Sequence, residues 1–376
     1  MQPDRSRRPR AAAWVPEVAG ILNADQVIST GHAIAAVQQR CGAIGWPDGH
    51  VDAWNHVECA MALSVCGRRD AARRAYEWLR VHQRPDGSWQ KVMPEAEADL
   101  TTESNHAAYC AVGVWHELLV SRDAGFAQRM WPTVKAAIDF VLGLQTPRGE
   151  IIWRRAADGS PDSYALLAGS ASMYSSLRCA AGLAEYLGEA QPDWELAAHQ
   201  LGHVVARHPE AFADKSRFSM DWYYPVLGGP VRGEEAIGHL KRGWDTYVVP
   251  GFGVRCVHDQ PWVTAAETAE LAIALETTGD SAGALDLLDQ IQLLRDPSGA
   301  YWTGWQYERR RHYPDEQSSY TAAAIVLAAD SLCGATGGSS LFRDVGADTH
   351  AVIRAGDAAC GCDPRDQAPD DVPDLV

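Results

Sequence analysis

The chain has 376 residues, enough for one large domain or two ordinary ones. Hydrophobic residues make up 46% and charged residues 22% of it, a balance typical of a folded globular protein and not of a disordered one. The formal net charge is −16 and no basic stripe is present, so nucleic acid is excluded as an expected partner. No apolar run reaches the length of about 18 residues that a membrane span needs.

The two ends of the chain are expected to lie outside the folded domain. Residues 1–20 carry basic side chains but no continuous apolar segment of the kind that a signal peptide needs, so we predict a short disordered arm and a cytoplasmic protein. Residues 346–376 are rich in Pro and Asp and are predicted to be a tail. This leaves residues 21–345 for a single folded domain.

Apolar residues recur at helical spacing along the whole chain. The predicted helices are, in chain order, 51–66, 70–82, 103–120, 125–144, 170–187, 193–207, 262–277, 281–294 and 317–333. Strand-like alternation with hairpin turns is scarce. The pattern therefore predicts helices packed on helices.

Two kinds of helix alternate along the chain. One kind is amphipathic, as in RRDAARRAYEWLRVHQ. The other is small and apolar and follows an aromatic or acidic loop, with starts near Asp52, Glu103, Ser170, Ser219, Gln260 and Glu316. These starts are spaced by about 53 residues on average, which is the length of a helix, a turn, a returning helix and a loop. We therefore predict an all-α fold, a single-domain (α/α)6 toroid with an inner and an outer ring of helices.

The loops carry a repeated pattern of Gln, Gly and Trp. Residues 85–89, PDGSW, follow Gln83, and looser copies run over 145–153 and 292–302. Pro and Gly end the preceding helix, the Gln amide can satisfy its last carbonyl groups, and the Trp packs over the turn. The segment AYEWLRVHQRPDGSW resembles the QW motif of the terpenoid cyclase and protein prenyltransferase superfamily. HAAYCAVGVWHELL and QSSYTAAAIVLAADSL are similar to inner helices of prenyltransferase β-subunit-like chains.

The resemblance covers roughly residues 45–333 and implies an α/α toroid that acts as a prenyltransferase- or cyclase-like transferase or isomerase. No catalytic residue carries over, because the DxDD motif of a squalene-cyclase-like enzyme is absent and no ligand spacing in the chain matches the Asp, Cys and His zinc site of a protein prenyltransferase. The magnesium-binding DDxxD motif is also absent. Mg²⁺ is therefore expected only if the substrate is a diphosphate, and no other cofactor is evident. Cys360 and Cys362 lie close together, but chance is the simpler interpretation in a tail, and no metal site is predicted.

In a toroid the inner-helix starts converge on one rim of the central cavity, which is the expected pocket for a small-molecule substrate. Four residues there are predicted to be catalytic: Asp52, His56, Glu103 and Asp259. Asp52 and His56 are four residues apart and can couple as an acid–base pair on one helix face. The predicted substrate-binding residues are Trp54, Asn105, His106, Tyr174, Asp221, Tyr223, Tyr224, Gln260, Trp262, Glu267, Glu316 and Gln317.

Each of these residues also has a structural interpretation. Asp52 and Glu103 are well placed to cap helices. A lone His on a helix, such as His56, is more often structural than catalytic. Trp54 and Trp262 are more often part of a core than a substrate platform. The joint occurrence of polar and aromatic groups at six helix starts is stronger evidence for a substrate pocket than any single position.

Three functions are compatible with such a pocket. The resemblance favours a prenyltransferase- or terpenoid cyclase-like enzyme, in which aromatic walls stabilise a carbocation, and we place this hypothesis first. The second is a carbohydrate-active enzyme, a hydrolase, lyase or epimerase with two carboxylates beside a sugar; the polarity of the pocket favours this hypothesis more than the first. The third is a non-catalytic toroid that binds a peptide or protein.

Overall fold

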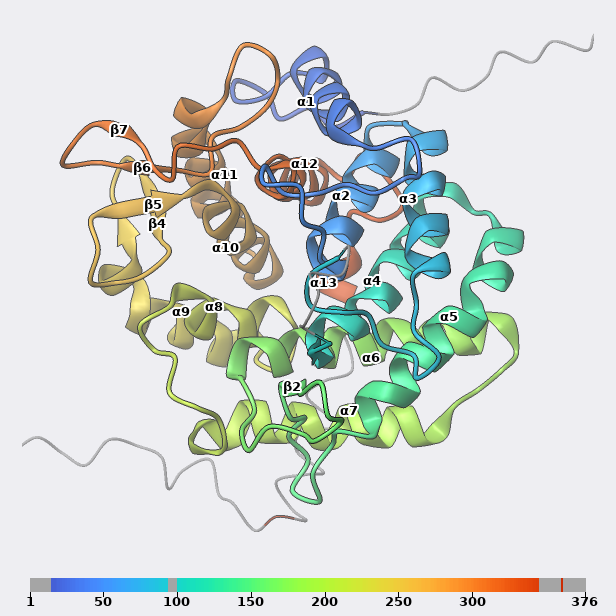
Figure 1. Cartoon of the computed structure of the whole chain (residues 1–376). Coiled ribbons are helices and arrows are strands. Elements are labelled where there is room, and N and C mark those ends of the chain that lie inside the picture. Colours follow the sequence, from blue (N-terminus) through green and yellow to red (C-terminus); the bar gives the residue numbers. More distant parts are fainter. Residues whose placement is uncertain (1–14, 94–99, 345–359, 361–376) are drawn as a thin grey trace, which may run out of the picture.

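The computed structural model describes residues 15–93, 100–344 and 360, and within them the protein is mostly helical (Figure 1). Residues 1–14 of the predicted arm and all of the predicted tail except Cys360 lie outside the described residues. Val18, inside the predicted arm, is buried and its backbone pairs with that of Leu22. No helix in the described part of the chain is long and apolar enough to cross a membrane.

The helices fall into an inner and an outer set. The inner helices are α2 (Ala53–Val65), α4 (Ser104–Ser121), α6 (Leu167–Leu187), α8 (Ser219–Leu227), α10 (Ala265–Thr278) and α12 (Ser319–Cys333). The outer helices are α1 (Ala24–Val37), α3 (Arg69–Val81), α5 (Ala124–Leu142), α7 (Pro192–Arg207), α9 (Gly233–Tyr247) and α11 (Ser281–Gln290). The structure also has two 3-10 turns, Pro209–Ala211 and Ile291–Leu294, and the short helix α13 (Leu341–Asp344).

The inner helices contact one another in chain order, and the last, α12, contacts the first, α2 (Figure 1). We call this closed set of helices the inner circuit. The outer helices pack around it: α3 on α2, α5 on α4, α7 on α6, α9 on α8, α11 on α10, and α1 on α12. The inner helices α2, α4, α6, α8 and α10 are each followed by an outer helix that returns along them, and α1 packs on α12, so all six inner helices start at the same end of the circuit.

Side-chain size explains why the inner helices can close into a circuit. Nearly every residue of α2 is buried, and α12 contains runs of small residues such as Ala322–Ala324. Small side chains let neighbouring helices approach closely, and a helix buried on all sides needs no polar face. In outer helix α3, by contrast, Ala72, Ala75 and Leu79 are fully buried on one face, while charged residues occupy the other. The two kinds of helix expected from the sequence are confirmed.

A repeated turn joins three of the outer helices, α1, α3 and α5, to the next outer helix in each case. The side-chain amides of Gln38, Gln83 and Gln145 each donate one hydrogen bond to the carbonyl of the Gly four residues later and another to a carbonyl of the next outer helix. After the second of these turns, the buried Trp89 indole donates to the Leu79 carbonyl at 2.8 Å. The repeated Gln, Gly and Trp of the sequence therefore have a structural role in holding neighbouring outer helices together.

Short strands lie near the starts of the inner helices, so the fold is mostly helical and not all-α. The strands are β1 (Thr102–Glu103), β2 (Arg154–Arg155), β3 (Val248–Val249), β4 (Gly253–Arg255), β5 (Trp262–Thr264), β6 (Gly304–Gln306) and β7 (Arg311–His312). β1 pairs with β2, and β3 to β7 form an antiparallel sheet in chain order. Each strand has two or three residues, too few for alternation to show in the sequence.

Gly87 should be the residue of the repeated turn that least tolerates a side chain. Its φ is +89°, and a Cβ there would lie 2.0 Å from the Ala136 carbonyl oxygen on α5. Gly159 has a similar φ of +86° but no atom within 4 Å of such a Cβ. Both substitutions strain a left-handed backbone, but only the Cβ of Gly87→Ala also overlaps a neighbouring helix. Gly87→Ala should therefore lower the free energy of unfolding by about 1–3 kcal/mol more than Gly159→Ala. Urea denaturation of the two variants measures the difference; equal losses would contradict the close packing of the turn on α5.

Candidate active site

Acidic and aromatic side chains gather at the end of the inner circuit where the inner helices start. Trp54, from the first turn of α2, stacks on Tyr109 of α4 with ring centroids 4.4 Å apart. The same Trp54 ring lies 6.0 Å from the ring of Tyr224 on α8. Because α8 stands opposite α2 in the circuit, these contacts cross its interior. The aromatic groups predicted for the substrate pocket are thus partly brought together, with Tyr109 as an additional member.

Asp52 is the N-cap of α2 and is buried at its start. Oδ1 accepts a hydrogen bond from the Asn55 backbone at 2.9 Å, while Oδ2 accepts from the Asn55 side-chain amide at 2.6 Å and from the Trp46 indole at 2.7 Å. The Trp46 ring is packed between His50 and Tyr320. The capping interpretation of Asp52 is therefore confirmed, and the same three donors fix its carboxylate in one orientation beside the aromatic cluster.

Glu103 precedes α4 but makes no capping hydrogen bond. It is buried, with its carboxylate oxygens 3.4 Å from Lys91 Nζ and 3.2 Å from His106 Nε2. His106 in turn meets the Trp54 ring edge-on. Asn105 lies on the other side of the α4 start, against Gly169 of α6. Glu103 is thus held in an ion-paired network at the wall of the circuit.

Two carboxyl groups, Glu58 and Glu270, lie deeper inside the circuit. Glu270 accepts hydrogen bonds from the hydroxyl groups of Tyr223, Tyr224 (2.8 Å) and Tyr320 (3.3 Å). Glu58 accepts one from Tyr109 at 2.9 Å. Both side chains line a cavity of about 10 Å³, which is roughly the space for one water molecule and far too small for a sugar. Glu58 and Glu270 therefore form the floor of the site.

Burial decides the ionisation of these floor carboxyls. Burial raises the pKa of Glu270 to about 7, although the Tyr223 and Tyr224 hydroxyls oppose the shift. Burial and the charge of Glu270 raise the pKa of Glu58 well above its usual range. A low-dielectric site disfavours two neighbouring negative charges. At neutral pH the pair therefore retains at least one proton.

Two further carboxyl groups lie nearer the end of the circuit where the inner helices start, which we call its mouth. Glu267 is in the first turn of α10, three residues before Glu270 and so on the same helical face. It is half-buried and accepts a hydrogen bond from the Cys256 thiol. Its negative charge contributes to raising the pKa of Tyr223. Asp221, in the first turn of α8, accepts a hydrogen bond from the Ala168 backbone at 3.2 Å. Burial raises the pKa of Asp221 to about 6.

His56 does not form the expected acid–base pair with Asp52. Its Nδ1 accepts a hydrogen bond from the Ile44 backbone at 3.2 Å, and its Nε2 donates to the Ala75 carbonyl of α3 at 2.9 Å. Burial lowers the pKa of His56 to about 4, so the ring is neutral and both nitrogens are engaged. The side chain joins α2 to α3 and faces away from the inner circuit.

Several other predicted residues lie outside the aromatic cluster. Asp259 is exposed on the loop between β4 and β5 and pairs with Arg217 at 2.9 Å, with the exposed Gln260 next to it. Tyr174 points to the outer layer, because its ring contacts Gly202 of α7. The remaining three are Trp262, which meets Tyr313 edge-on, Glu316, which contacts Thr303, and Gln317, which bonds Asp296.

Sequence reasoning did not single out Trp46, Lys91 or Glu270. Trp46 and Lys91 lie in loops, where no periodicity marks them. Glu270 did have a signal: it follows Glu267 by three residues in the otherwise small and apolar segment TAAETAELAIAL. A carboxylate on a fully buried helix is costly unless it is hydrogen-bonded, so its presence there indicates a polar interior.

Three solved structures with a similar fold are named as carbohydrate enzymes. A glycosidase superposes with a TM-score of 0.63 at 14% identity over 83% of this chain and 97% of its own. A family 63 mannosylglycerate hydrolase from Thermus thermophilus gives 0.64 at 12% identity over 80% and 99%. A D-mannose isomerase gives 0.60 at 11% identity over 81% and 96%. The fold is thus a glycosidase-type fold.

A closer relative identifies the family. The chain is 49% identical, over 88% of its length and 92% of the relative's, to the MMP endo-(1,4)-3-O-methyl-alpha-D-mannosidase of Mycolicibacterium hassiacum. The chain belongs to the family of this mannosidase and is a glycoside hydrolase. No protein-family model matches the sequence.

The resemblance to terpenoid cyclases and prenyltransferases was therefore wrong, as was the transferase or isomerase activity drawn from it. The mannosidase relative overturns both. The physical reason lies in the motif itself: Gln83, Gly87 and Trp89 tie outer helices together and touch none of the site carboxyls. The magnesium expectation depended on a diphosphate substrate and is not carried over. The carbohydrate alternative was the better hypothesis.

The floor carboxyl Glu270 should make stability depend on pH. Its pKa is about 7 in the folded protein against 4.5 ordinarily, so between these values the folded state keeps a proton that the unfolded state releases. Stability should then fall by up to about 3 kcal/mol as the pH rises through this window and level off above it. In Glu270→Gln the decline should be smaller. Urea denaturation between about pH 5 and about pH 8 measures both slopes; identical slopes would show that Glu270 does not hold the proton.

Proposed function

We propose that this glycoside hydrolase cleaves internal α-(1→4) linkages of a 3-O-methylmannose polysaccharide. The observation that carries the proposal is the 49% identity, over nearly the whole of both chains, to an enzyme named for that activity. The polar and aromatic interior of the inner circuit supports a sugar substrate. Tyr and Trp rings can pack on sugar faces while carboxylates act on the glycosidic bond.

We further infer that the inner circuit and its outer helices are the predicted (α/α)6 toroid. The cyclic contacts of the six inner helices and the pairing of each with an outer helix support this architecture. In such a toroid the saccharide enters at the end where the inner helices start. Small-molecule sites favour such a concave opening with a few convergent polar groups.

Asp52 and Glu267 are the catalytic pair in this proposal. They start two inner helices, α2 and α10, which flank α12 in the circuit. Glycoside hydrolysis needs one carboxylic acid that protonates the leaving oxygen and one carboxylate on the other side of the sugar. Asp52 accepts three hydrogen bonds, which favour its charged form and so suit the role of the carboxylate. Glu267 is half-buried next to the floor carboxyl Glu270, which suits the acid.

Four other carboxyl groups, Glu58, Glu103, Asp259 and Glu270, fit these two roles less well. The negative charge of Glu103 is balanced by the positive charge of Lys91, and its side chain lies at the wall of the circuit. Asp259 is exposed and paired with Arg217. Glu58 and Glu270 lie at the floor, beside a cavity that no sugar can enter. The role of Glu103 is therefore revised from catalysis to positioning of His106 and the Trp54 ring.

The reaction follows from these assignments. Glu267 donates its proton to the glycosidic oxygen as the bond from the anomeric carbon breaks. Asp52 stabilises the positive charge that develops on the sugar ring. Water then bonds to the anomeric carbon and gives its proton to the Glu267 carboxylate, which restores the acid. Trp54, which Tyr109 supports from behind by stacking, binds the sugar face, and the hydroxyl-lined floor sets the depth of the pocket.

Asp52→Asn and Glu267→Gln should each lower kcat for an α-(1→4)-linked 3-O-methylmannose oligosaccharide by about a thousandfold or more, because each removes half of the acid–carboxylate pair. Asn caps a helix as well as Asp does, so the melting temperature of Asp52→Asn should stay within a few degrees of the wild type. Product analysis by chromatography and a thermal melt of each variant give the two readouts.

A matched control is Asp280→Asn, since Asp280 is the N-cap of the outer helix α11 and accepts a hydrogen bond from the Gly283 backbone. It should retain wild-type activity. Full activity in folded Asp52→Asn or Glu267→Gln would refute the assignment of the pair. Absence of cleavage by the wild-type chain would refute the substrate.

A further inference from the structure

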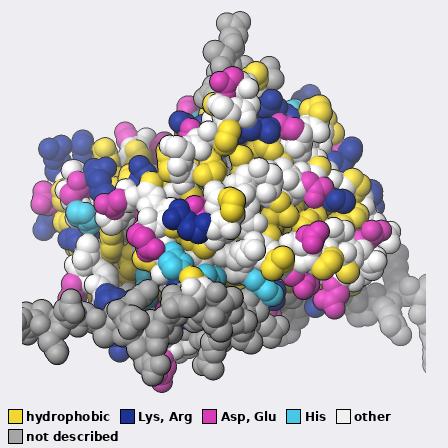
Figure 2. Space-filling model, turned by 90° about the horizontal axis from the view of Figure 1, so that it is seen from below, with side chains coloured by type: hydrophobic (Ala, Val, Ile, Leu, Met, Phe, Trp, Pro, Cys, Tyr) yellow, Lys and Arg dark blue, Asp and Glu magenta, His cyan; other side chains and the backbone are white. Residues whose placement is uncertain are grey.

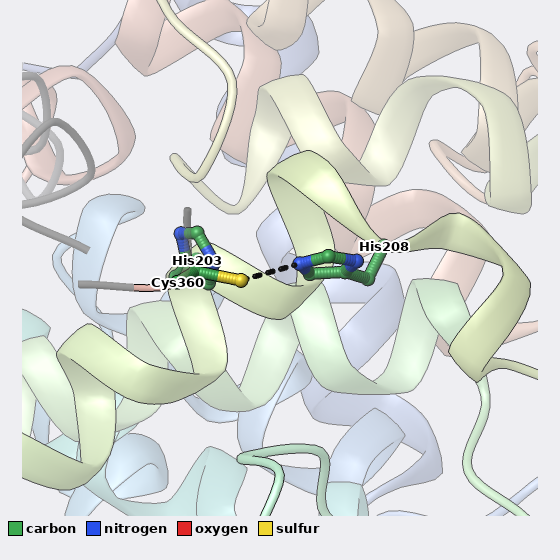
Figure 3. A group of neighbouring side chains, drawn as sticks. All are labelled: His203, His208 and Cys360. Carbon is green, nitrogen blue, oxygen red and sulfur yellow. Dashed lines mark hydrogen bonds between the residues drawn. The ribbon is translucent and has the colours of Figure 1, made fainter. Parts of the chain in front are cut away.

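A cluster of metal-ligating side chains lies on the outer layer, away from the inner circuit. His203 is in the last turn of α7, His208 caps the same helix, and Cys360 comes from the C-terminal part of the chain (Figure 3). One ligand atom of each residue lies within 4.8 Å of the others. Of the described residues, these three alone gather in this way. The face of the molecule seen from below in Figure 2 shows His side chains together beside residues that are not described.

The geometry of the cluster resembles that of a metal site. Cys360 Sγ and His208 Nε2 are 3.5 Å apart, close to the ligand-to-ligand edge of roughly 3.4 Å in a tetrahedron with zinc bond lengths. The other ring nitrogen of His208 lies 3.1 Å from a carboxylate oxygen of Glu210. A carboxylate behind a ligating His fixes the ring and makes its free nitrogen a better ligand.

Both histidines are held by a rigid element. Leu201, Val204 and Val205 of α7 are buried against the core, and the ring centroids of His203 and His208 are 5.2 Å apart. The backbone of His208 leaves the helical conformation, which turns its ring back toward His203. Two of the three ligands are therefore nearly in place before a metal binds.

We propose that His203, His208 and Cys360 bind one Zn²⁺ ion, with water in the fourth position. Two imidazoles and one thiolate suit this borderline-soft cation better than Mg²⁺ or Ca²⁺, which prefer oxygen ligands. On binding, the Cys360 thiol loses its proton to solvent and the sulfur donates to the metal. The ion ties residue 360 to α7. In this proposal Cys360 is a ligand, contrary to the expectation of a chance tail cysteine, while Cys362 lies outside the described residues.

Zinc binding to the full-length chain, first stripped with a chelator, tests the proposal. Isothermal titration with ZnCl₂ should give one site per chain. His203→Ala and Cys360→Ser should each weaken binding by about a hundredfold or more because each removes a ligand, and Glu210→Gln by about tenfold because it removes the group behind His208. With Co²⁺ in place of zinc, the wild type should show a thiolate-to-cobalt charge-transfer band that Cys360→Ser lacks.

Cys41→Ser is the matched control, since Cys41 is also a free, exposed cysteine and its loss should leave zinc affinity unchanged. Absence of a stoichiometric site in the wild type would overturn the proposal. Equal affinity in the wild type, His203→Ala and Cys360→Ser would also overturn it. Because the readout is metal binding, it is independent of the proposed glycosidase activity.

Discussion

Close packing of small side chains in the inner circuit is the constraint on which the rest of the structure depends. Small buried residues such as Ala60 of α2 and Ala322–Ala324 of α12 let these helices touch neighbours on both sides. The outer helices are joined by turns such as that of Gln83 and Gly87. Once every inner helix pairs with a returning outer helix, all inner starts meet at one end. The connectivity therefore brings the six inner-helix starts together, which is where we propose the active site.

The interior of the circuit is polar despite its apolar walls. Burying carboxyl groups is costly unless they are hydrogen-bonded or protonated. Hydrogen bonds from Tyr223, Tyr224 and Tyr320 offset this cost at Glu270. Glu270 and Glu58 together also retain a proton at neutral pH. The tyrosines thus stabilise the floor, while Asp52 and Glu267 stand nearer the mouth. Polarity at this depth fits a sugar and not a hydrocarbon substrate.

Much of the helical framework could be predicted from the sequence, because periodicity marks long amphipathic and apolar segments. Helices α1 and α9 were both missed. The glycines of α9 weaken its helical signal, and Gly243 is required there because a Cβ would lie 2.4 Å from the Trp222 indole nitrogen. Asp52 was recognisable as a residue at a helix start, but the contacts of His56 with Ile44 and Ala75 depend on tertiary packing that no local pattern reveals. The function was misjudged because a turn motif that serves packing was read as a sign of chemistry.

We propose that a methylated mannose saccharide is cleaved between Asp52 and Glu267, at the end of the inner circuit where the inner helices start. A crystal structure of Glu267→Gln with an α-(1→4)-linked 3-O-methylmannose oligosaccharide tests this proposal most directly. We expect a glycosidic oxygen next to residue 267, Asp52 across the same sugar, and a sugar face against Trp54. A saccharide bound instead in the outer groove between α9 and α10, lined by Leu240, Trp244 and Leu275, would contradict it.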